Sequence, residues 1–520
     1  MATSRTARRP RRRPPATTTG KPRGVLHPRV QLVGPEHFGI VCFDCAKARS
    51  KFLLADFYGR VLLPPTKVDH NRPDLAAAVT QIRHAFATHQ LHDGLVAIER
   101  TGRYHRLVQR TFAAAGFETR ILHPFVTKQY RQPVDPGNKT DDTDLSAIHR
   151  ATVTGCALLE ATRDQAWTTL QLLIRHRRDL VEKGAALNCQ IREHLEAVVP
   201  GFAACFDKFW DSPVPWHLLR LFPSAVQLRD AGLTTLCHSL RQAGIRFQQR
   251  TVQTVLDWAD QAAPADVAAS QHHRIALALF DDRQRKTLEI QALERDIAGR
   301  LVQTPYLLLL SFPGINVVSA ADFAGEMGPI EHYANAKCIT GRAGLRPSRY
   351  QSDQVDRANG PLVRNCNRAL RAAILRIADN LIGCNHHFNV LATQWAAQGK
   401  DPRHTRVKVA GRFCRIAFQM VAGRQVFRHP GIQGRHYILD KLSAFHTAHD
   451  TGVAEVMRDL QAAVGQIPTS EHAAEAGPLA EELRQIQDGH RRGPQLLGDI
   501  LPIVLARLGV GVVQSTESGE

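Results

Sequence analysis

Short apolar runs alternate with amphipathic stretches from residue 37 onward, which is the pattern of an α/β domain. Helical periodicity follows an Asn-type start at 71–90 and recurs at 101–116, where Gly116 ends the pattern. The turn-like residues Tyr58 and Gly59 separate the second and third apolar runs, so we expect the first three runs to form a meander. The five predicted strands are FGIVCFD (38–44), KFLLADF (51–57), RVLLP (60–64), GLVAIE (94–99) and ETRILHP (118–124).

The pattern changes to long helices at 165–200 and 284–302. Leu173, Leu180 and Leu187 recur every seven residues, and charged side chains fill most of the remaining positions. This spacing fits two long amphipathic helices, paired as an antiparallel or intermolecular coiled coil or packed as two core helices of a bundle. The segment between them has an irregular helical pattern.

The C-terminal part of the chain is predicted to be mostly helical. LLSFPGINVVSAADFAGEMG (309–328) has the pattern of a helix, a Pro-Gly turn and a second helix, resembling a helix-hairpin-helix element. Residues 360–430 are helical and basic. From 431 onward we expect a separate extension of unknown role, with weak helices at 452–464 and 477–487 and an apolar stretch at 494–513.

The positive net charge of the chain indicates what kind of molecule it binds. The formal net charge is +19, and 54 of the 67 Lys and Arg residues are Arg, whose guanidinium binds phosphate oxygens in pairs. Nucleic acid is therefore the expected partner, although a genome whose base composition favours Arg codons would give the same bias. Residues 1–35 are rich in Arg and Pro and predict a disordered basic arm. The longest apolar runs are too short to span a bilayer and no secretory signal is recognisable, so we expect a cytoplasmic, nucleoid-associated protein.

Four carboxylates stand at places where such a fold would bring them together. Asp44 ends the first predicted strand and Glu99 ends the fourth, and the helix after the fifth strand begins with acidic residues. Asp141 and Asp144 are three positions apart and share one face of that helix. The order of strands and helices resembles the RNase H-like (RuvC-like) fold, in which these strand ends lie side by side beneath a later helix. Clustered carboxylates repel one another unless cations neutralise them, and hard oxygen ligands suit Mg²⁺.

Simpler interpretations exist for each of these residues. Asp141 and Asp144 would favour a helix N-terminus through the helix dipole alone, and Glu99 could be a surface residue at a strand end. Cys42 and Cys45 have CxxC spacing, but without a second such pair we interpret them as strand side chains.

Several motifs together resemble the DEDD-type transposases of bacterial insertion sequences, which are bridge-RNA-guided recombinases. The N-terminal motifs are GIVCFDCAK, AIERTGRY and the HP…KTDDTD run, and the C-terminal motifs are LSFPGINVVSAA, GRAGLRPSRYQSD and RNCNRALR, over roughly residues 37–430. The resemblance implies an RNase H-like catalytic domain at 36–160, a helical coiled-coil region at 161–303 and a C-terminal transposase domain at 304–430. It also implies that Asp44, Glu99, Asp141 and Asp144 are catalytic metal ligands.

The resemblance further implies a catalytic serine after the Gly-Leu-x-Pro turn. Ser352 occupies this position, with Ser348 as a nearby alternative. The family usually has Gly after this serine and before Asn367, where this chain has Asp353 and Cys366. The basic residues around the serine fit contacts to nucleic-acid phosphates: Arg346, Arg349, Arg364, Arg368 and Arg371.

Family membership would make the chain a recombinase that exchanges DNA strands with Mg²⁺ through a covalent phosphoserine. Its partners would be donor and target DNA, a structured guide RNA, and further copies of itself in homodimers that pair into tetramers. Two alternatives remain open at this point. One is a RuvC-like metal-dependent nuclease or junction resolvase without serine chemistry, and the other is a non-catalytic RNA-binding protein.

Overall fold

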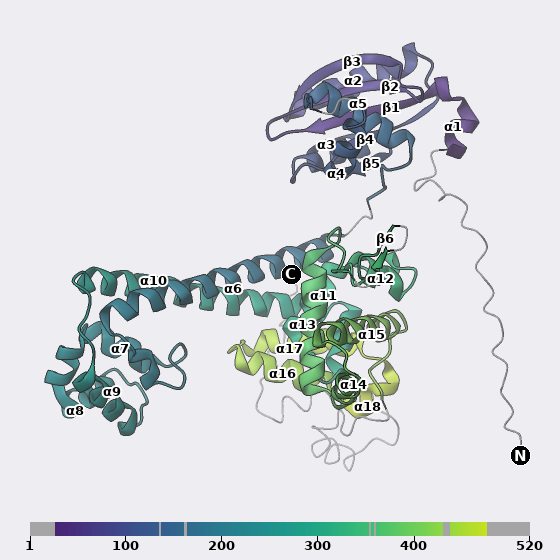
Figure 1. Ribbon diagram of the computed structural model, residues 1–520. Coiled ribbons are helices and arrows are strands. Elements are labelled where there is room, and N and C mark those ends of the chain that lie inside the picture. Colours follow the sequence, from purple (N-terminus) through teal and green to yellow (C-terminus); the bar gives the residue numbers. More distant parts are fainter. Residues whose placement is uncertain are drawn as a thin grey trace, which may run out of the picture. The chain divides into compact units, whose positions relative to one another are not determined.

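The computed structural model describes residues 27–134, 137–160, 164–352, 355–357, 360–429 and 437–475. The chain divides after residue 162 into two compact units. The first unit carries the sheet and the second is almost entirely helical (Figure 1). In the described residues, no helix combines the length and the apolar character needed to cross a membrane.

The first unit is built on one five-stranded sheet with the strand order β3-β2-β1-β4-β5. The first three strands pair antiparallel, which confirms the meander, whereas β1–β4 and β4–β5 are parallel pairs. This order and these directions are consistent with the predicted RNase H-like domain. The strands are β1 (Phe38–Cys45), β2 (Arg49–Asp56), β3 (Val61–Asp69), β4 (Asp93–Glu99) and β5 (Thr119–Leu122).

Helices cover both faces of this sheet, because side chains of successive strand residues point to opposite faces. Phe43 and Ile98 face the side where α2 and α3 pack, and Cys42 and Ala97 face the side covered by α5. Asn71 caps α2 by accepting a 2.8 Å hydrogen bond from the Asp74 amide, as its Asn-type start predicts. The helices are α2 (Arg72–Thr88), α3 (His105–Ala114), α4 (Pro124–Arg131) and α5 (Asp141–Val153).

Part of the predicted disordered arm is ordered, so its boundary at residue 35 is wrong. Residues His27–Val33 form helix α1, followed by the 3-10 turn η1 (Pro35–His37). Val30 is buried, and Arg29 makes 2.8 Å ion-pair contacts with Asp93 and Glu118. These contacts outweigh the Arg- and Pro-rich composition that favours disorder. Residues 1–26 lie outside the described part of the chain.

Two long helices organise the second unit, α6 (Gln165–Val198) and α10 (Ala269–Leu301). Leu170 near the start of α6 shares a core with Leu301 at the end of α10. Leu195 near the end of α6 shares a second core with Ala276 near the start of α10. The helices therefore run antiparallel within one chain, and α10 begins fifteen residues before the predicted start at 284. Between them lie η2 (Phe202–Cys205), α7 (Pro213–Leu221), α8 (Ala225–Gln242) and α9 (Gln249–Gln261).

The predicted helix–turn–helix at 309–328 is present in modified form. Its first segment is a 3-10 helix, η3 (Pro305–Ser311), which is buried from Tyr306 to Ser311, and the turn at Gly314 leads into α11 (Val317–Met327). The remaining elements of this region surround the same core. They are η4 (Ile330–His332), α12 (Ala336–Arg342), β6 (Tyr350–Ser352), β7 (Val355–Arg357), α13 (Arg368–Cys384), α14 (His386–Ala397) and α15 (Pro402–Ala422).

A buried carboxylate joins three of these helices. Glu326 on α11 is fully buried and accepts hydrogen bonds of 2.9 and 2.8 Å from Arg175 on α6. Asn367, the N-cap residue of α13, donates a further 3.1 Å bond. Burial raises the pKa of Glu326, but the bonds from Arg175 and Asn367 outweigh it, so the pKa lies below its ordinary value. The carboxylate therefore ties α6, α11 and α13 together.

The predicted separate C-terminal extension is also corrected. Residues 438–475 pack into the main core of the second unit, with Leu442 and Leu460 buried against it. Lys441 reaches into that core and donates bonds of 2.8 and 2.9 Å to the carbonyls of Phe312 and Ile315. Its helices are α16 (Ile438–Ala448), α17 (Val453–Gln466), η5 (Thr469–Glu471) and α18 (His472–Glu475). The weak helix predicted at 477–487 and the apolar stretch at 494–513 lie outside the described residues.

Candidate active site

The first two predicted acids lie side by side at the end of the sheet. Phe43 on β1 is paired with Ile98 on β4 in the parallel register, so the next residues, Asp44 and Glu99, are neighbours. Because Phe43 and Ile98 face the α2–α3 side, alternation directs Asp44 and Glu99 to the side covered by α5. Both side chains are half-buried there.

Helix α5 brings the other two acids to the same face. Thr140 caps the helix, because its hydroxyl accepts a bond of 3.2 Å from the Thr143 amide, while the Thr143 hydroxyl accepts one of 3.0 Å from the Thr140 amide. This capping box fixes the first turn, which contains Asp141 and Asp144. Asp144 is buried and Asp141 is exposed. Carboxylates in a first turn are stabilised by the helix dipole.

The third acid of this turn is engaged elsewhere, as its helical position predicts. Asp142 forms a 2.6 Å ion pair with Lys51 of β2. Lys51 is paired with Asp44 across the β1–β2 ladder, so the lysine stands beside the acidic cluster. Sequence reasoning missed Lys51, although its place opposite Asp44 follows once the meander is assigned.

The electrostatics show that the four predicted acids share one local field. Burial raises the pKa of Asp44, and the charges of Asp144 and Asp141 raise it further, against the opposing charge of Lys139. Burial also raises the pKa of Glu99, and the charges of Asp44 and Asp144 add to it. Carboxylates that raise one another's pKa in a half-buried position are candidates for a cation site.

Helix α4 contributes two side chains that sequence reasoning did not select. Thr127 and Arg131 are four positions apart and therefore lie on one face of the helix. The Thr127 hydroxyl is buried beside Glu99 and partly opposes the rise that burial causes in the pKa of that acid, although it lacks a hydrogen bond of standard geometry. The guanidinium of Arg131 forms an ion pair with the carboxylate of Asp144. The i, i+4 spacing directly after strand β5 was the signal available for finding them.

The donor chemistry of this cluster suits a divalent cation. Four carboxylates offer only hard oxygen ligands, which is the set that Mg²⁺ prefers. Across the described residues, however, no three His, Cys, Asp or Glu side chains stand close enough together to hold one metal ion. In this structure the Asp144 carboxylate forms an ion pair with Arg131 instead. Cys42 and Cys45 are buried free thiols of β1.

Ser352, the predicted nucleophile, lies in the second unit at the end of β6. Its side chain is exposed, and its backbone pairs with Val355 of β7 in a two-stranded hairpin. Ser348 is half-buried at the base of the hairpin, where its amide donates a 2.9 Å bond to the Pro361 carbonyl. Of the two serines, Ser352 therefore presents the more accessible hydroxyl.

The five predicted phosphate-contacting arginines divide into two groups. Arg371 is half-buried, and its guanidinium donates to the carbonyls of Ala343 and Val363 and contacts the Cys366 sulfur at 2.7 Å. These contacts attach the hairpin segment to α13. The other four have exposed side chains around the hairpin and the start of α13: Arg346, Arg349, Arg364 and Arg368.

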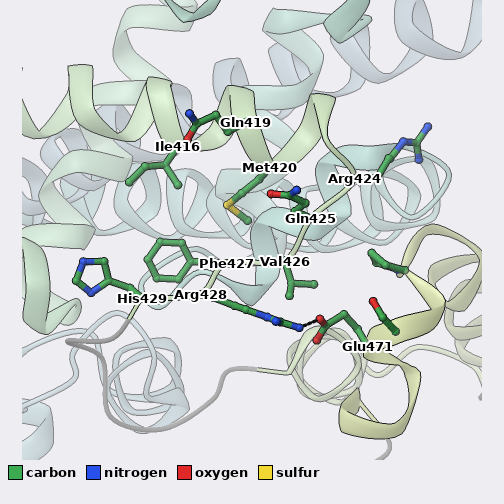
Figure 2. Close-up of a pocket in the computed structure, with 12 residues that line it drawn as sticks. Ile416, Gln419, Met420, Arg424, Gln425, Val426, Phe427, Arg428, His429 and Glu471 are labelled. Carbon is green, nitrogen blue, oxygen red and sulfur yellow. Dashed lines mark hydrogen bonds and ion pairs between the residues drawn. The ribbon is translucent and has the colours of Figure 1, made fainter.

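A cavity of about 540 Å³ lies elsewhere in the second unit, between the end of α15 and η5 (Figure 2). Arg428 and Glu471 line it and form an ion pair with each other. Its lining includes none of the predicted site residues, so it adds nothing to the acidic cluster or the serine hairpin.

Comparison with known proteins assigns both regions to one kind of protein. Residues 41–200 match the IS110 DEDD family described as transposase, and residues 306–392 match the transposase IS116/IS110/IS902 family. An uncharacterized 43.6 kDa protein of insertion element IS110 from Streptomyces coelicolor is 23% identical over 291 residues, covering 55% of this chain and 71% of the relative. An uncharacterized 44.8 kDa protein of insertion element IS116 from Streptomyces clavuligerus is 26% identical over 209 residues, covering 39% and 49%.

Proposed function

Because the chain belongs to the IS116/IS110/IS902 family of transposases, we propose that it exchanges DNA strands by Mg²⁺-dependent serine chemistry under the direction of a structured RNA. The observation that carries the metal part is the common field of four acids on one face of the sheet. The proposed metal ligands are Asp44, Glu99, Asp141 and Asp144, and the proposed nucleophile is Ser352.

The chemistry proposed for the serine balances without a further reactant. The Ser352 hydroxyl attacks a backbone phosphorus and passes its proton to water, while the bond from that phosphorus to one deoxyribose oxygen breaks and the released oxygen takes a proton. The new phosphoserine bond then breaks when a hydroxyl of a second strand attacks, which restores the serine. When bound, Mg²⁺ would supply Lewis-acid stabilisation of the charge on the phosphoryl oxygens.

Exposure of Ser352 supports its selection over Ser348, and a matched pair of variants tests it. End-labelled transposon DNA is incubated with Mg²⁺ and the full chain, and the covalent protein–DNA adduct is measured on a denaturing gel. We expect Ser352→Ala to abolish the adduct and Ser348→Ala to retain it. Nicking that continues in Ser352→Ala without any adduct in the parent protein would instead establish the RuvC-like nuclease.

The acids are tested separately from the serine. We expect Asp44→Asn and Asp144→Asn to abolish strand exchange and to leave RNA binding nearly intact. Strand exchange that survives both changes would refute the metal-site proposal, and an absence of strand exchange in the parent protein alongside tight RNA binding would support a non-catalytic RNA-binding protein.

The proposed RNA guide and assembly rest on the resemblance and on the Arg surplus of the chain. The RNA would pair with donor and target DNA while the protein reads shape and backbone, a division of labour known from other RNA-guided systems. Homodimers pairing into tetramers would bring two DNA partners together. Sequencing the RNA that co-purifies with the protein tests the guide, and reads that map to the DNA flanking the gene are the expected result.

A further inference from the structure

The region around α14 and α15 is unusually rich in positive charge. Residues 379–424 contain seven Lys and Arg against two acids, Asp379 and Asp401, which gives 7 − 2 = +5, and Asp379 forms an ion pair with Arg406. Asp401 caps α15 by accepting a 2.6 Å bond from the Arg403 amide, so its carboxylate is committed to the helix terminus. None of the residues named for the proposed function belongs to this segment.

The turn between the two helices fixes one lysine against an aromatic ring. Gly399 takes the left-handed conformation with φ of +71° and donates a 2.9 Å bond to the Ala396 carbonyl. The Lys400 amide donates a 3.1 Å bond to the Trp395 carbonyl. These two bonds form a Schellman motif, which determines where the chain leaves α14. The Lys400 ammonium consequently lies 6.0 Å from the centre of the Trp395 ring.

A second lysine reaches the same ring from α15. The Lys408 ammonium lies 5.3 Å from the ring centre of Trp395. The pKa of Lys408 is lowered by its contact with Lys400, because two like charges share one small surface. Neither lysine forms an ion pair with an acid in the described part of the chain, and the Lys400 ammonium donates a 3.1 Å hydrogen bond to the Gln398 side chain.

Positive charge continues along the helix from this pair. Arg412 and Arg415 follow Lys408 at spacings of four and three, which places all three on one side of α15. Burial lowers the pKa of His387 on α14, and the charges of His429 and Arg412 lower it further, so Arg412 lies near the start of α14. Cations gathered on one surface in this way attract an anion to it.

We propose that Lys400 and Lys408, held against Trp395, form a binding site for a backbone phosphate of the DNA on which this transposase acts. The assignment to DNA follows from the family, and the site is independent of the proposed acid and serine chemistry. Two adjacent ammonium groups bind a phosphate as point charges and do not distinguish bases. The site therefore contributes affinity and positioning rather than sequence selection.

The test measures how DNA binding depends on salt. The full chain is titrated against a fluorescent DNA duplex at several salt concentrations, and the slope of log K against log salt is determined by anisotropy. The slope is negative, and each lost phosphate contact reduces its magnitude by about 0.9. We expect Lys400→Gln with Lys408→Gln to reduce the magnitude of the slope by about 1 and to weaken binding roughly tenfold at low salt.

A matched control removes two positive charges from other lysines, each of which is already paired with an acid. Lys183 is paired with Asp179 and Lys286 with Asp282, so Lys183→Gln with Lys286→Gln should leave the slope unchanged. Lys400→Arg with Lys408→Arg should restore binding, which distinguishes loss of charge from loss of fold. An unchanged slope in the Gln pair, equal losses in the control, or a loss confined to an RNA duplex would overturn the proposal.

Discussion

The ion pair between Arg131 and Asp144 gives the sharpest prediction about the acidic cluster. The two side chains retain only 14% and 7% of their exposed surface, so the pair is nearly shielded from water. Replacing Arg131 by Gln leaves a buried carboxylate beside Asp44 and Glu99 without its cation. Removing one partner of a buried pair costs about 3–5 kcal/mol, and the dipole of α5 offsets up to about 1 kcal/mol.

We therefore expect Arg131→Gln to reduce the free energy of unfolding of the first unit by about 2–4 kcal/mol in the presence of EDTA. This corresponds to a drop in melting temperature of roughly 5–12 °C for a unit of this size. In contrast, Mg²⁺ should stabilise the variant more than the parent protein, because in the variant Mg²⁺ no longer competes with the Arg131 guanidinium for the carboxylate of Asp144. A concentration of 100 times the dissociation constant contributes about 2.7 kcal/mol.

The assay is thermal unfolding of the full chain in EDTA and in a Mg²⁺ series, with Arg49→Gln as the control. Arg49 pairs with Asp69 on the surface, where both side chains are about half exposed. Such a pair contributes less than about 1 kcal/mol, and its loss should be insensitive to Mg²⁺. Equal Mg²⁺ shifts in Arg131→Gln and the parent protein would refute the idea that Arg131 and a cation share Asp144.

Further predictions concern stability in both units. Burial lowers the pKa of Lys441 to about 8, so between pH 8 and 10.5 the unfolded state binds more protons than the folded state. The free energy of unfolding should therefore rise across that window by about 1–3 kcal/mol. Denaturant titrations of Lys441→Met should lack this rise. Glu326→Gln leaves Arg175 without its carboxylate and should cost about 2–4 kcal/mol by chemical denaturation, whereas no change would show that the network adds nothing. Gly94→Ala brings a methyl group within 2.4 Å of the Gly39 carbonyl and should lower the melting temperature strongly, while Gly411→Ala, with open space within α15, should raise it slightly.

The placement of the acids was accessible from the sequence because it depends on local rules. A strand that ends in Asp44, a strand that ends in Glu99 and a helix that starts with Asp141 need only the strand order to be brought together. Apolar runs and an Asn-type helix start identify those elements without any tertiary information. The register of Phe43 with Ile98 then follows from burying both faces of two central strands.

The features that could not be predicted from the sequence depend on contacts between distant segments of the chain. The ion pairs of Arg29 with residues of β4 and with Glu118 cannot be inferred from an Arg-rich composition, so α1 was assigned to a disordered arm. Helices α16 and α17 have ordinary amphipathic patterns that do not reveal which core they join. The role of Arg131 was missed because α4 is short and nothing local indicates that its cation meets Asp144.

The buried Glu326 also constrains the order in which the second unit can fold. Its arginine partner on α6 leaves the ribosome about 150 residues before it, and its asparagine partner at the start of α13 follows some 40 residues later. Until that asparagine emerges, the carboxylate lacks part of its bonding and cannot be enclosed without a penalty. Helix α6 and the start of α13 must therefore pack around this carboxylate late in synthesis. A nascent chain truncated before residue 367 should consequently remain a target for chaperones.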